Sequence, residues 1–202
     1  DKIMLDGFKS LENRDFKIEN GEKIMEHARS IKSVEEIKAM RCSISACETS
    51  MHIMENKTKP GMAENDIWSI LHSENIKRGG EWIETRLLSS GTKTNPWFQE
   101  CGSRVLQNNE IVAFDTDLVG CYSICTDISR TWWIGDQEPT KEMKQDYRIA
   151  LDHIQQNAEL VAPGVHFKDL TFKGHQLDNI YKKQLDFWFF VYRSLGGGKI
   201  IK

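Results

Sequence analysis

A short pattern that occurs twice constrains the fold of this chain more than any other feature. Residues 59–62 read Lys-Pro-Gly-Met and precede Asp66-Ile67, while residues 162–165 read Ala-Pro-Gly-Val and precede Asp169-Leu170 at the same offset. In each copy a long predicted helix ends at Pro-Gly and a shorter helix follows. Such self-similarity indicates a duplicated unit, although Pro-Gly also ends many unrelated helices. Fewer residues follow the second copy, so we expect the second unit to be incomplete.

Three helices are predicted from end signals and from apolar residues at helical spacing. The first begins at Ser33, where Ser33-Val34-Glu35-Glu36 has the spacing of a capping box, and ends at Pro60-Gly61. The second covers about 63–77, and the third runs from Pro139-Thr140 to Pro163-Gly164. Their expected buried faces are Ile37, Met40, Ile44, Cys47, Met51 and Met54; Ile67, Ile70 and Leu71; and Met143, Tyr147, Leu151, Ile154, Ala158 and Val161.

Between the second and third predicted helices, the hydrophobic pattern changes to the alternation typical of strands. Residues 82–89 are one candidate strand, and residues 91–96 have the composition of a loop. Residues 111–119 are expected to pair with residues 122–133 around a tight turn at Gly120-Cys121. The fold class is therefore α+β, with helices beside an antiparallel sheet.

Three aspartates in this strand pair are candidate metal ligands. Asp115 and Asp117 point to one face of a strand, about 7 Å apart, and the turn predicts that Asp115 faces Thr126 or Asp127. Converging carboxylates repel one another unless a cation holds them ionised, and their oxygens suit magnesium, manganese or iron. The alternative is a solvated sheet face, with Asp127 capping a turn and Arg130 as an ion-pair partner.

Composition excludes several other classes of function. The formal net charge is −3, and no segment concentrates enough Lys and Arg to predict a nucleic-acid or membrane surface. The longest apolar run, 187–192, is too short to cross a membrane, so we expect a cytoplasmic protein. The five cysteines have no CxxC spacing and are expected to be reduced packing residues.

Several of these segments resemble known families. The helix opening at 29–37, the Pro60-Gly61 stop and the segment 127–131 are similar to the creatinase, aminopeptidase P and methionine aminopeptidase superfamily, which has the duplicated pita-bread fold. The segments that most resemble the dimethylsulfoniopropionate lyases of marine bacteria, within that superfamily, are 85–91, 95–102, 114–118 and 170–177. The resemblance covers about residues 21–185.

The resemblance implies a function and a set of site residues. It implies that Asp115, Asp117 and Asp127 bind a metal, iron in the first place with zinc or manganese as alternatives, and that the enzyme is a homodimer acting on a small molecule. The loop before the first metal-binding strand lacks the substrate-binding histidine of the peptidases and carries Trp97 and Phe98, which suit a sulfonium cation. The alternative for these two rings is a core or dimer contact. The implied reaction is base-assisted β-elimination to dimethyl sulfide and acrylate. An Xaa-Pro aminopeptidase-like metallopeptidase and a non-catalytic module or fragment are the alternatives.

The resemblance also implies metal ligands that this chain does not supply. The remaining histidine and two glutamates of the family lie beyond the segment 174–177, yet no His or Glu follows Leu185. We therefore expect a chain that is inactive alone, from a truncated gene or a shifted reading frame, and assign no catalytic residue. His153, His166 and His175 are interpreted as surface or packing residues. The expected organisation is 1–20 as a linker from an upstream domain, 21–185 as a partial catalytic domain and 186–202 as an aberrant tail.

Overall fold

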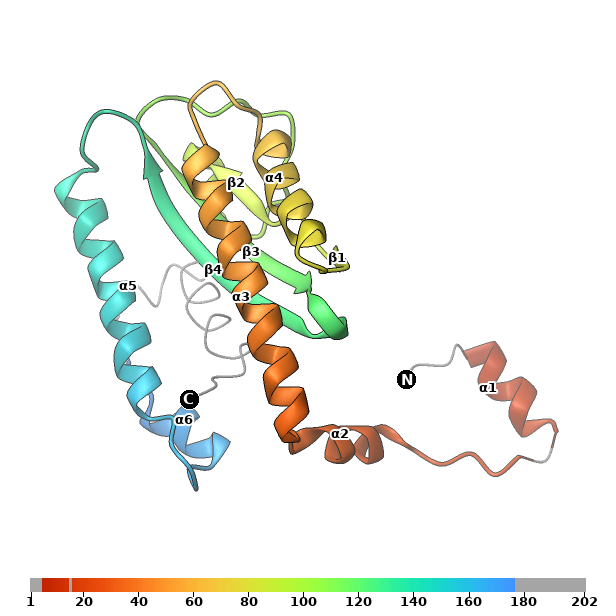
Figure 1. The fold of residues 1–202 in the computed structure, drawn as a ribbon. Coiled ribbons are helices and arrows are strands. Elements are labelled where there is room, and N and C mark those ends of the chain that lie inside the picture. Colours follow the sequence, from red (N-terminus) through yellow and green to blue (C-terminus); the bar gives the residue numbers. More distant parts are fainter. Residues whose placement is uncertain (1–4, 15, 177–202) are drawn as a thin grey trace. The chain divides into compact units, whose positions relative to one another are not determined.

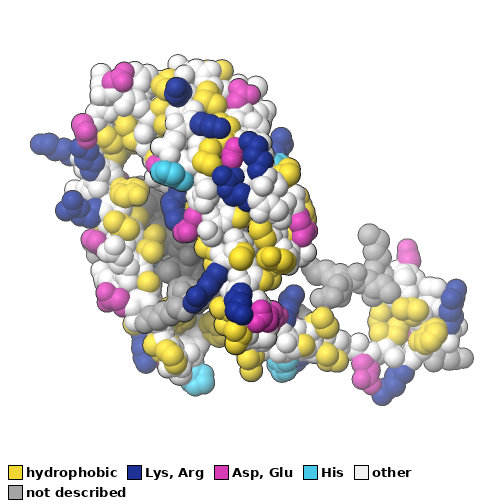
Figure 2. All heavy atoms as spheres, viewed as in Figure 1, with side chains coloured by type: hydrophobic (Ala, Val, Ile, Leu, Met, Phe, Trp, Pro, Cys, Tyr) yellow, Lys and Arg dark blue, Asp and Glu magenta, His cyan; other side chains and the backbone are white. Residues whose placement is uncertain are grey.

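A computed structural model describes residues 5–14 and 16–176, so the predicted tail at 186–202 lies outside the described residues (Figure 1). The chain divides into two compact units, residues 1–38 and 39–202. Helix α3 (Val34–Lys57) begins in the first unit and continues into the second. On the viewed face, acidic and basic side chains are interspersed (Figure 2), in line with the near-balanced charge.

Residues 1–20, expected to be an irregular linker, contain the helix α1 (Leu5–Glu12). Helix α2 (Glu22–Ser30) follows after that region. In α1, Asp6 in the first turn and Lys9 in the last turn complement the helix dipole, a signal that the overall polarity of residues 1–20 obscured. The predicted capping box is confirmed, because Ser33 N donates to Glu36 Oε2 at 2.7 Å and Glu36 N donates to Ser33 Oγ at 3.2 Å.

In the second unit, α3 and α4 (Glu64–Lys77) lie side by side against one face of a sheet (Figure 1). Most of their predicted apolar residues form the core with the inward side chains of the sheet, although Ile37 and Ile44 are only partly buried and lie outside it. Cys47, Met54, Ile67 and Leu71 are completely buried there. Burial raises the pKa of the Cys47 thiol, and all five cysteines are free.

The sheet is antiparallel and has β3 (Glu110–Val119) at its centre. Strand β4 (Cys125–Ile134) pairs along one edge of β3, while β1 (Trp82–Ile83) and β2 (Leu88–Ser90) share the other edge. The prediction of one continuous strand over 82–89 is therefore wrong, because two short strands occupy its ends. Residues 84–87 leave regular pairing there, although Glu84 N still donates to Asp117 O at 2.9 Å.

The turn between β3 and β4 also differs from the prediction. In place of a tight turn at Gly120-Cys121, the 3₁₀ turn η2 (Cys121–Ser123) joins the strands, and Gly120 N donates to Ile124 O at 3.0 Å. Tyr122 and Ser123 adopt left-handed backbone conformations, with φ of 62° and 56°. Because neither is a glycine or asparagine, their side chains give no sequence signal for this conformation.

The second helix pair repeats the first, as the sequence pattern predicts. Helix α5 (Lys141–Glu159) is followed by Pro163-Gly164 and α6 (Phe167–Lys173), and Thr140 caps α5 by accepting from Met143 N at 3.1 Å. Gly61 and Gly164 have the same left-handed backbone, with φ of 90° and 85°. The predicted buried face of α5 is not buried, since Tyr147 and Leu151 are 56% and 42% exposed. None of the described helices is long and apolar enough to span a membrane.

Candidate metal site and its neighbouring loop

The three predicted ligands lie on one face of the β3–β4 hairpin. Asp117 pairs directly with Asp127, and Asp115 pairs with Ser129. The predicted register, with Asp115 opposite Thr126 or Asp127, is wrong because the longer turn shifts the pairing. The common face survives this shift, since Asp115 and Asp117 are two residues apart and Asp127 opposes one of them.

The alternation of side chains explains how aspartates are accommodated in these strands. Val112, Phe114 and Leu118 point to the helix side of β3 and are buried in the core, so the intervening aspartates point to the other face. Asp115 is 2% exposed, whereas Asp117 is partly buried. Arg130 pairs with Phe114 and therefore lies on the helix side, where its guanidinium donates to Ser129 O at 2.8 Å.

Two hydroxyl groups that the sequence analysis missed orient the aspartates. Ser129 Oγ donates to Asp115 Oδ1 at 2.7 Å, and Thr85 Oγ1 donates to Asp117 Oδ2 at 3.1 Å. Thr85 reaches Asp117 because the chain between β1 and β2 departs from regular pairing, and Leu87 O accepts from Asp115 N at 2.9 Å. Ser129 could have been found from the correct register, but Thr85 had no signal in the sequence.

The donor set fits a hard metal ion only in part. Three carboxylates on one face supply the oxygen ligands that iron, manganese or magnesium accept. However, residues 5–14 and 16–176 contain no group of three or more His, Cys, Asp or Glu side chains arranged to hold a metal ion. The hairpin thus brings Asp117 and Asp127 together and places Asp115 beside them without completing a site.

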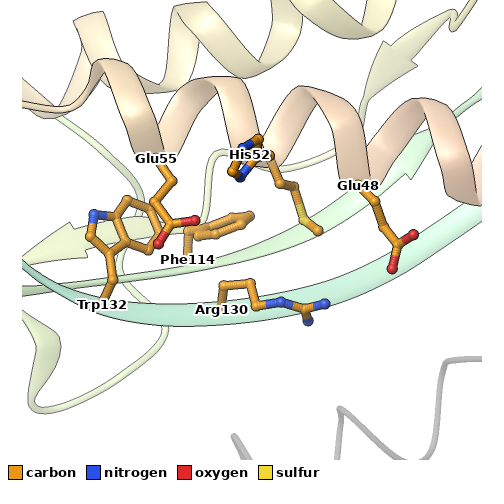
Figure 3. A pocket seen from close by; sticks show the side chains of 7 residues that line it. Glu48, His52, Glu55, Phe114, Arg130 and Trp132 are labelled. Carbon is orange, nitrogen blue, oxygen red and sulfur yellow. The ribbon is translucent and has the colours of Figure 1, made fainter.

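A pocket of about 160 Å³ lies on the opposite, helix side of the hairpin (Figure 3). Glu48, His52 and Glu55 line it from α3, and Arg130 and Trp132 line it from β4. The buried residues Met51 and Phe114 complete its lining. The ring of Phe114 packs edge-on against that of Trp132, with 5.4 Å between the ring centroids. Since the sheet separates this pocket from the aspartates, it is distinct from the candidate metal site.

The loop after β2 carries the two predicted substrate-binding residues, which differ in exposure. Trp97 is 9% exposed, while Phe98 is 48% exposed and has a left-handed φ of 82°. At the base of the loop, Glu100 forms a β-bridge with Leu87, and Cys101 N donates to Arg86 O at 2.8 Å. The loop is therefore joined to the same segment, 84–87, that hydrogen-bonds to the aspartate strand.

The histidines lie outside this site. His153 on α5 is 4% exposed, and its Nε2 lies 3.0 Å from His175 O. Burial lowers the pKa of His153 below its ordinary value of 6.5, outweighing the hydrogen bond to His175. His166 is exposed at the start of α6.

Comparison with known proteins identifies the family to which the chain is similar. A sequence model of metallopeptidase family M24 matches residues 38–189. Two proteins named dimethylsulfoniopropionate lyase DddP, from Roseobacter denitrificans and Roseovarius nubinhibens, are 54% and 52% identical to the chain over 189 residues. These matches cover 91% of the chain but only 42% of each relative, so the chain spans less than half of their length.

The fold is shared with solved aminopeptidases. The X-Pro aminopeptidase from Thermotoga maritima superposes with a TM-score of 0.74 at 23% identity, over 83% of this chain and 47% of that one. At this identity the likeness concerns the fold alone. It confirms the predicted α+β pita-bread architecture, represented here by part of the domain.

Proposed function

The chain belongs to metallopeptidase family M24, and from this premise we propose that it is part of a metal-dependent lyase that cleaves dimethylsulfoniopropionate to dimethyl sulfide and acrylate. The observation that carries the proposal is the 54% and 52% identity to two named dimethylsulfoniopropionate lyases. The structurally similar aminopeptidase is only 23% identical. We therefore infer the substrate from the two lyases, which have the higher sequence identity, and use the aminopeptidase only as evidence for the fold.

In this proposal, Asp115, Asp117 and Asp127 hold the metal, with iron as the first candidate and zinc or manganese as alternatives. Their shared face and the direct pairing of Asp117 with Asp127 support the assignment. When bound, the metal supplies a Lewis acid for the negative charge that develops beside the substrate carboxylate as the proton leaves. Thr85 and Ser129 orient Asp117 and Asp115 through their hydroxyl groups.

The substrate cation is assigned to the aromatic loop. Phe98 exposes about half of its side chain, and a cation over a ring face gains about 0.5–2 kcal/mol. Trp97 is mostly buried and offers a smaller contact area beside it. The proposal leaves the catalytic base unassigned.

Residues 5–14 and 16–176 do not complete this site by themselves, and we propose that the chain is inactive alone. The three carboxylates support weak metal binding at most, and the described residues hold no complete ligand group. We also propose that the whole enzyme is a cytoplasmic homodimer from a marine bacterium that acts on a small molecule and not on nucleic acid or membranes. Its near-balanced charge supports the last point.

A chimera tests the proposal directly. The matching segment of the Roseobacter denitrificans lyase is replaced by this chain, and dimethyl sulfide is measured in the headspace with dimethylsulfoniopropionate as substrate. We expect release by the chimera, none by the isolated chain, and loss of both activity and bound metal in the Asp117→Ala variant. Asp152→Ala, on an exposed position of α5, is the matched control and retains both.

The other outcomes distinguish the alternative functions. Release of the N-terminal residue from an Xaa-Pro peptide, without dimethyl sulfide, would identify a peptidase. A folded chimera with no bound metal and neither activity would identify a non-catalytic module. Retained lyase activity in Asp117→Ala would remove the metal-site assignment.

A further inference from the structure

The first residue of α4 has contacts that its helix does not explain. Glu64 is completely buried, and its Oε1 accepts hydrogen bonds from Ser90 N at 2.9 Å and Ser90 Oγ at 2.8 Å. Its Oε2 accepts from Lys93 Nζ at 2.7 Å and Gly102 N at 3.2 Å. All four donors belong to residues 90–102, which include the loop that carries Trp97 and Phe98. One carboxylate therefore binds both ends of that loop.

The role of Glu64 is not that of a helix cap. An acidic residue in a first turn commonly interacts with the backbone of its own helix. In α4 this is done by Asp66, whose Oδ2 accepts from Ala63 N at 3.2 Å. Glu64 instead places a buried charge against the loop, and such a charge is costly unless it is well hydrogen-bonded, as it is here.

Besides the ion pair between Glu64 and Lys93, a second ion pair packs against the start of the loop, at Ser90 and Gly91. Arg104 donates to both carboxylate oxygens of Glu110, at 2.7 and 2.6 Å, and also to Ser90 Oγ. A Cβ atom on Gly91 would lie 2.3 Å from Glu110 Oε2 and 2.6 Å from Arg104 Nη2, so the pair packs directly on the glycine. Burial opposes ionisation of Glu110, but hydrogen bonds from Arg104 and Gln107 N outweigh it and lower its pKa.

The anchored loop is continuous with the candidate metal site. Cys101, which directly precedes Gly102, donates from its N to Arg86 O at 2.8 Å. The next residue after Arg86, Leu87, accepts at its O from Asp115 N at 2.9 Å. In the same segment, Thr85 donates to Asp117. A shift of the loop relative to β3 would therefore change where Phe98 lies with respect to the aspartates.

We propose that Glu64 is a positioning residue for substrate binding: it fixes the loop 91–102 through Ser90, Lys93 and Gly102 and so sets the place of Phe98. The assignment of Phe98 to the substrate rests on the proposed function. The fixing of the loop does not, because it rests on the contacts of Glu64 alone.

Hydrogen exchange of the whole chain tests the loop first. Glu64→Gln keeps the shape of the side chain but turns an amide NH₂ toward the Lys93 and Gly102 donors, so we expect exchange across 91–102 to accelerate by about tenfold or more. Glu74→Gln is the matched control, because it neutralises another buried, ion-paired glutamate of α4 and leaves that exchange unchanged. Unchanged exchange in Glu64→Gln overturns the proposal.

A second variant tests the same hydrogen bonds in case Glu64→Gln does not fold. Lys93→Met removes one donor from a side chain that is 25% exposed, and it should accelerate exchange in the same peptides by a smaller factor. Lys93→Arg should restore protection. Lys144→Met, in an exposed pair with Glu138, is its control. Equal exchange in Lys93→Met and the unaltered chain counts against the anchor.

Kinetics of the chimera then tests the substrate role. Loss of positioning at Phe98 raises the KM for dimethylsulfoniopropionate several-fold in Glu64→Gln with a smaller change in kcat, whereas simple loss of folded enzyme lowers kcat at constant KM. Constant KM overturns the substrate role of Glu64. A chimera without lyase activity overturns the proposed function instead, and the exchange result on the loop still stands.

Discussion

The two ends of α4 each carry a buried glutamate, and the two differ in how far away their partners lie. Glu74 is held by Lys77 and Arg78, three and four residues on, at 2.8 and 2.7 Å, with Lys57 of α3 at 4.0 Å. Glu64 is held by residues 26 to 38 positions away. The first arrangement stabilises the helix that contains it, whereas the second connects that helix to a distant loop.

This difference also separates what each glutamate can do. Hydrogen bonds from Lys77 and then Arg78 lower the pKa of Glu74 to about 2, and its ion-pair partners include no residue of the candidate site. Glu64 instead binds the loop whose base adjoins the aspartate strand. The comparison predicts that variants at Glu64 act at long range and variants at Glu74 act locally.

The largest expected effect comes from truncating the two glutamates. Glu64→Ala leaves four donors without their acceptor and removes the partner of Lys93, so we expect the free energy of unfolding to fall by about 3–5 kcal/mol. Glu74→Ala should cost less, because Lys77 is 62% exposed and can turn to water. Urea unfolding followed by circular dichroism measures both, and equal losses would break the comparison.

The features that could be predicted from the sequence are those that depend on local contacts, like those of Glu74. The capping box at Ser33, the two Pro-Gly units and the common face of the aspartates depend on contacts within a few residues or on strand alternation, and the structure contains all of them. Periodicity and capping patterns encode such local features directly. Spacing alone likewise gives the Glu74 pairs at i+3 and i+4.

The features that could not be predicted depend on long-range geometry. The observed hairpin register differs from the predicted one because Tyr122 and Ser123 adopt left-handed backbone conformations that cannot be inferred from their residue types. The strand 82–89 is interrupted where Thr85 turns toward Asp117, a contact between residues 32 apart. Periodicity predicts a buried face on α5 that the structure leaves exposed, because the spacing shows that a face is apolar but not whether other residues cover it.

The next largest effect concerns the glycines of the loop and of the second Pro-Gly unit. Gly91 and Gly164 both have a positive φ, 54° and 85°, so alanine strains the backbone at either position. Only at Gly91 would the new Cβ meet the Arg104–Glu110 pair, whereas nothing lies within 4 Å at Gly164.

We therefore expect Gly91→Ala to destabilise the chain by about 1–3 kcal/mol more than Gly164→Ala. Thermal unfolding of the two variants gives this difference. An equal loss would mean that the ion pair moves aside without cost and does not enclose the loop end.

A smaller effect extends the comparison to α5, where His153 contacts His175, 22 residues away. Because burial lowers its pKa below 6.5, the unfolded chain binds a proton more readily than the folded one. The contribution of neutral His153 to the free energy of unfolding is therefore fully present above pH 6.5 and is lost as the pH falls below that value. His153→Gln, which keeps an amide donor but does not titrate, should flatten this part of the stability–pH curve, and an unchanged curve in this variant would contradict the assignment to His153.

The smallest expected effect is the acid response of Glu74. Its pKa is about 2 in the folded chain against an ordinary value of 4.5, so its stabilising contribution is present above pH 4.5 and is lost as the pH falls from 4.5 toward 2. Glu74→Gln should lower stability at pH 7 and show a shallower decline between pH 4.5 and 2 than the unaltered chain. Hydrogen exchange in 91–102 should not change in that variant at pH 7, because the partners of Glu74 lie in α3, in α4 and at the residue that directly follows α4. If the loop nevertheless loosened, the two ends of α4 would be coupled, and the distinction between a local and a long-range glutamate would have to be abandoned.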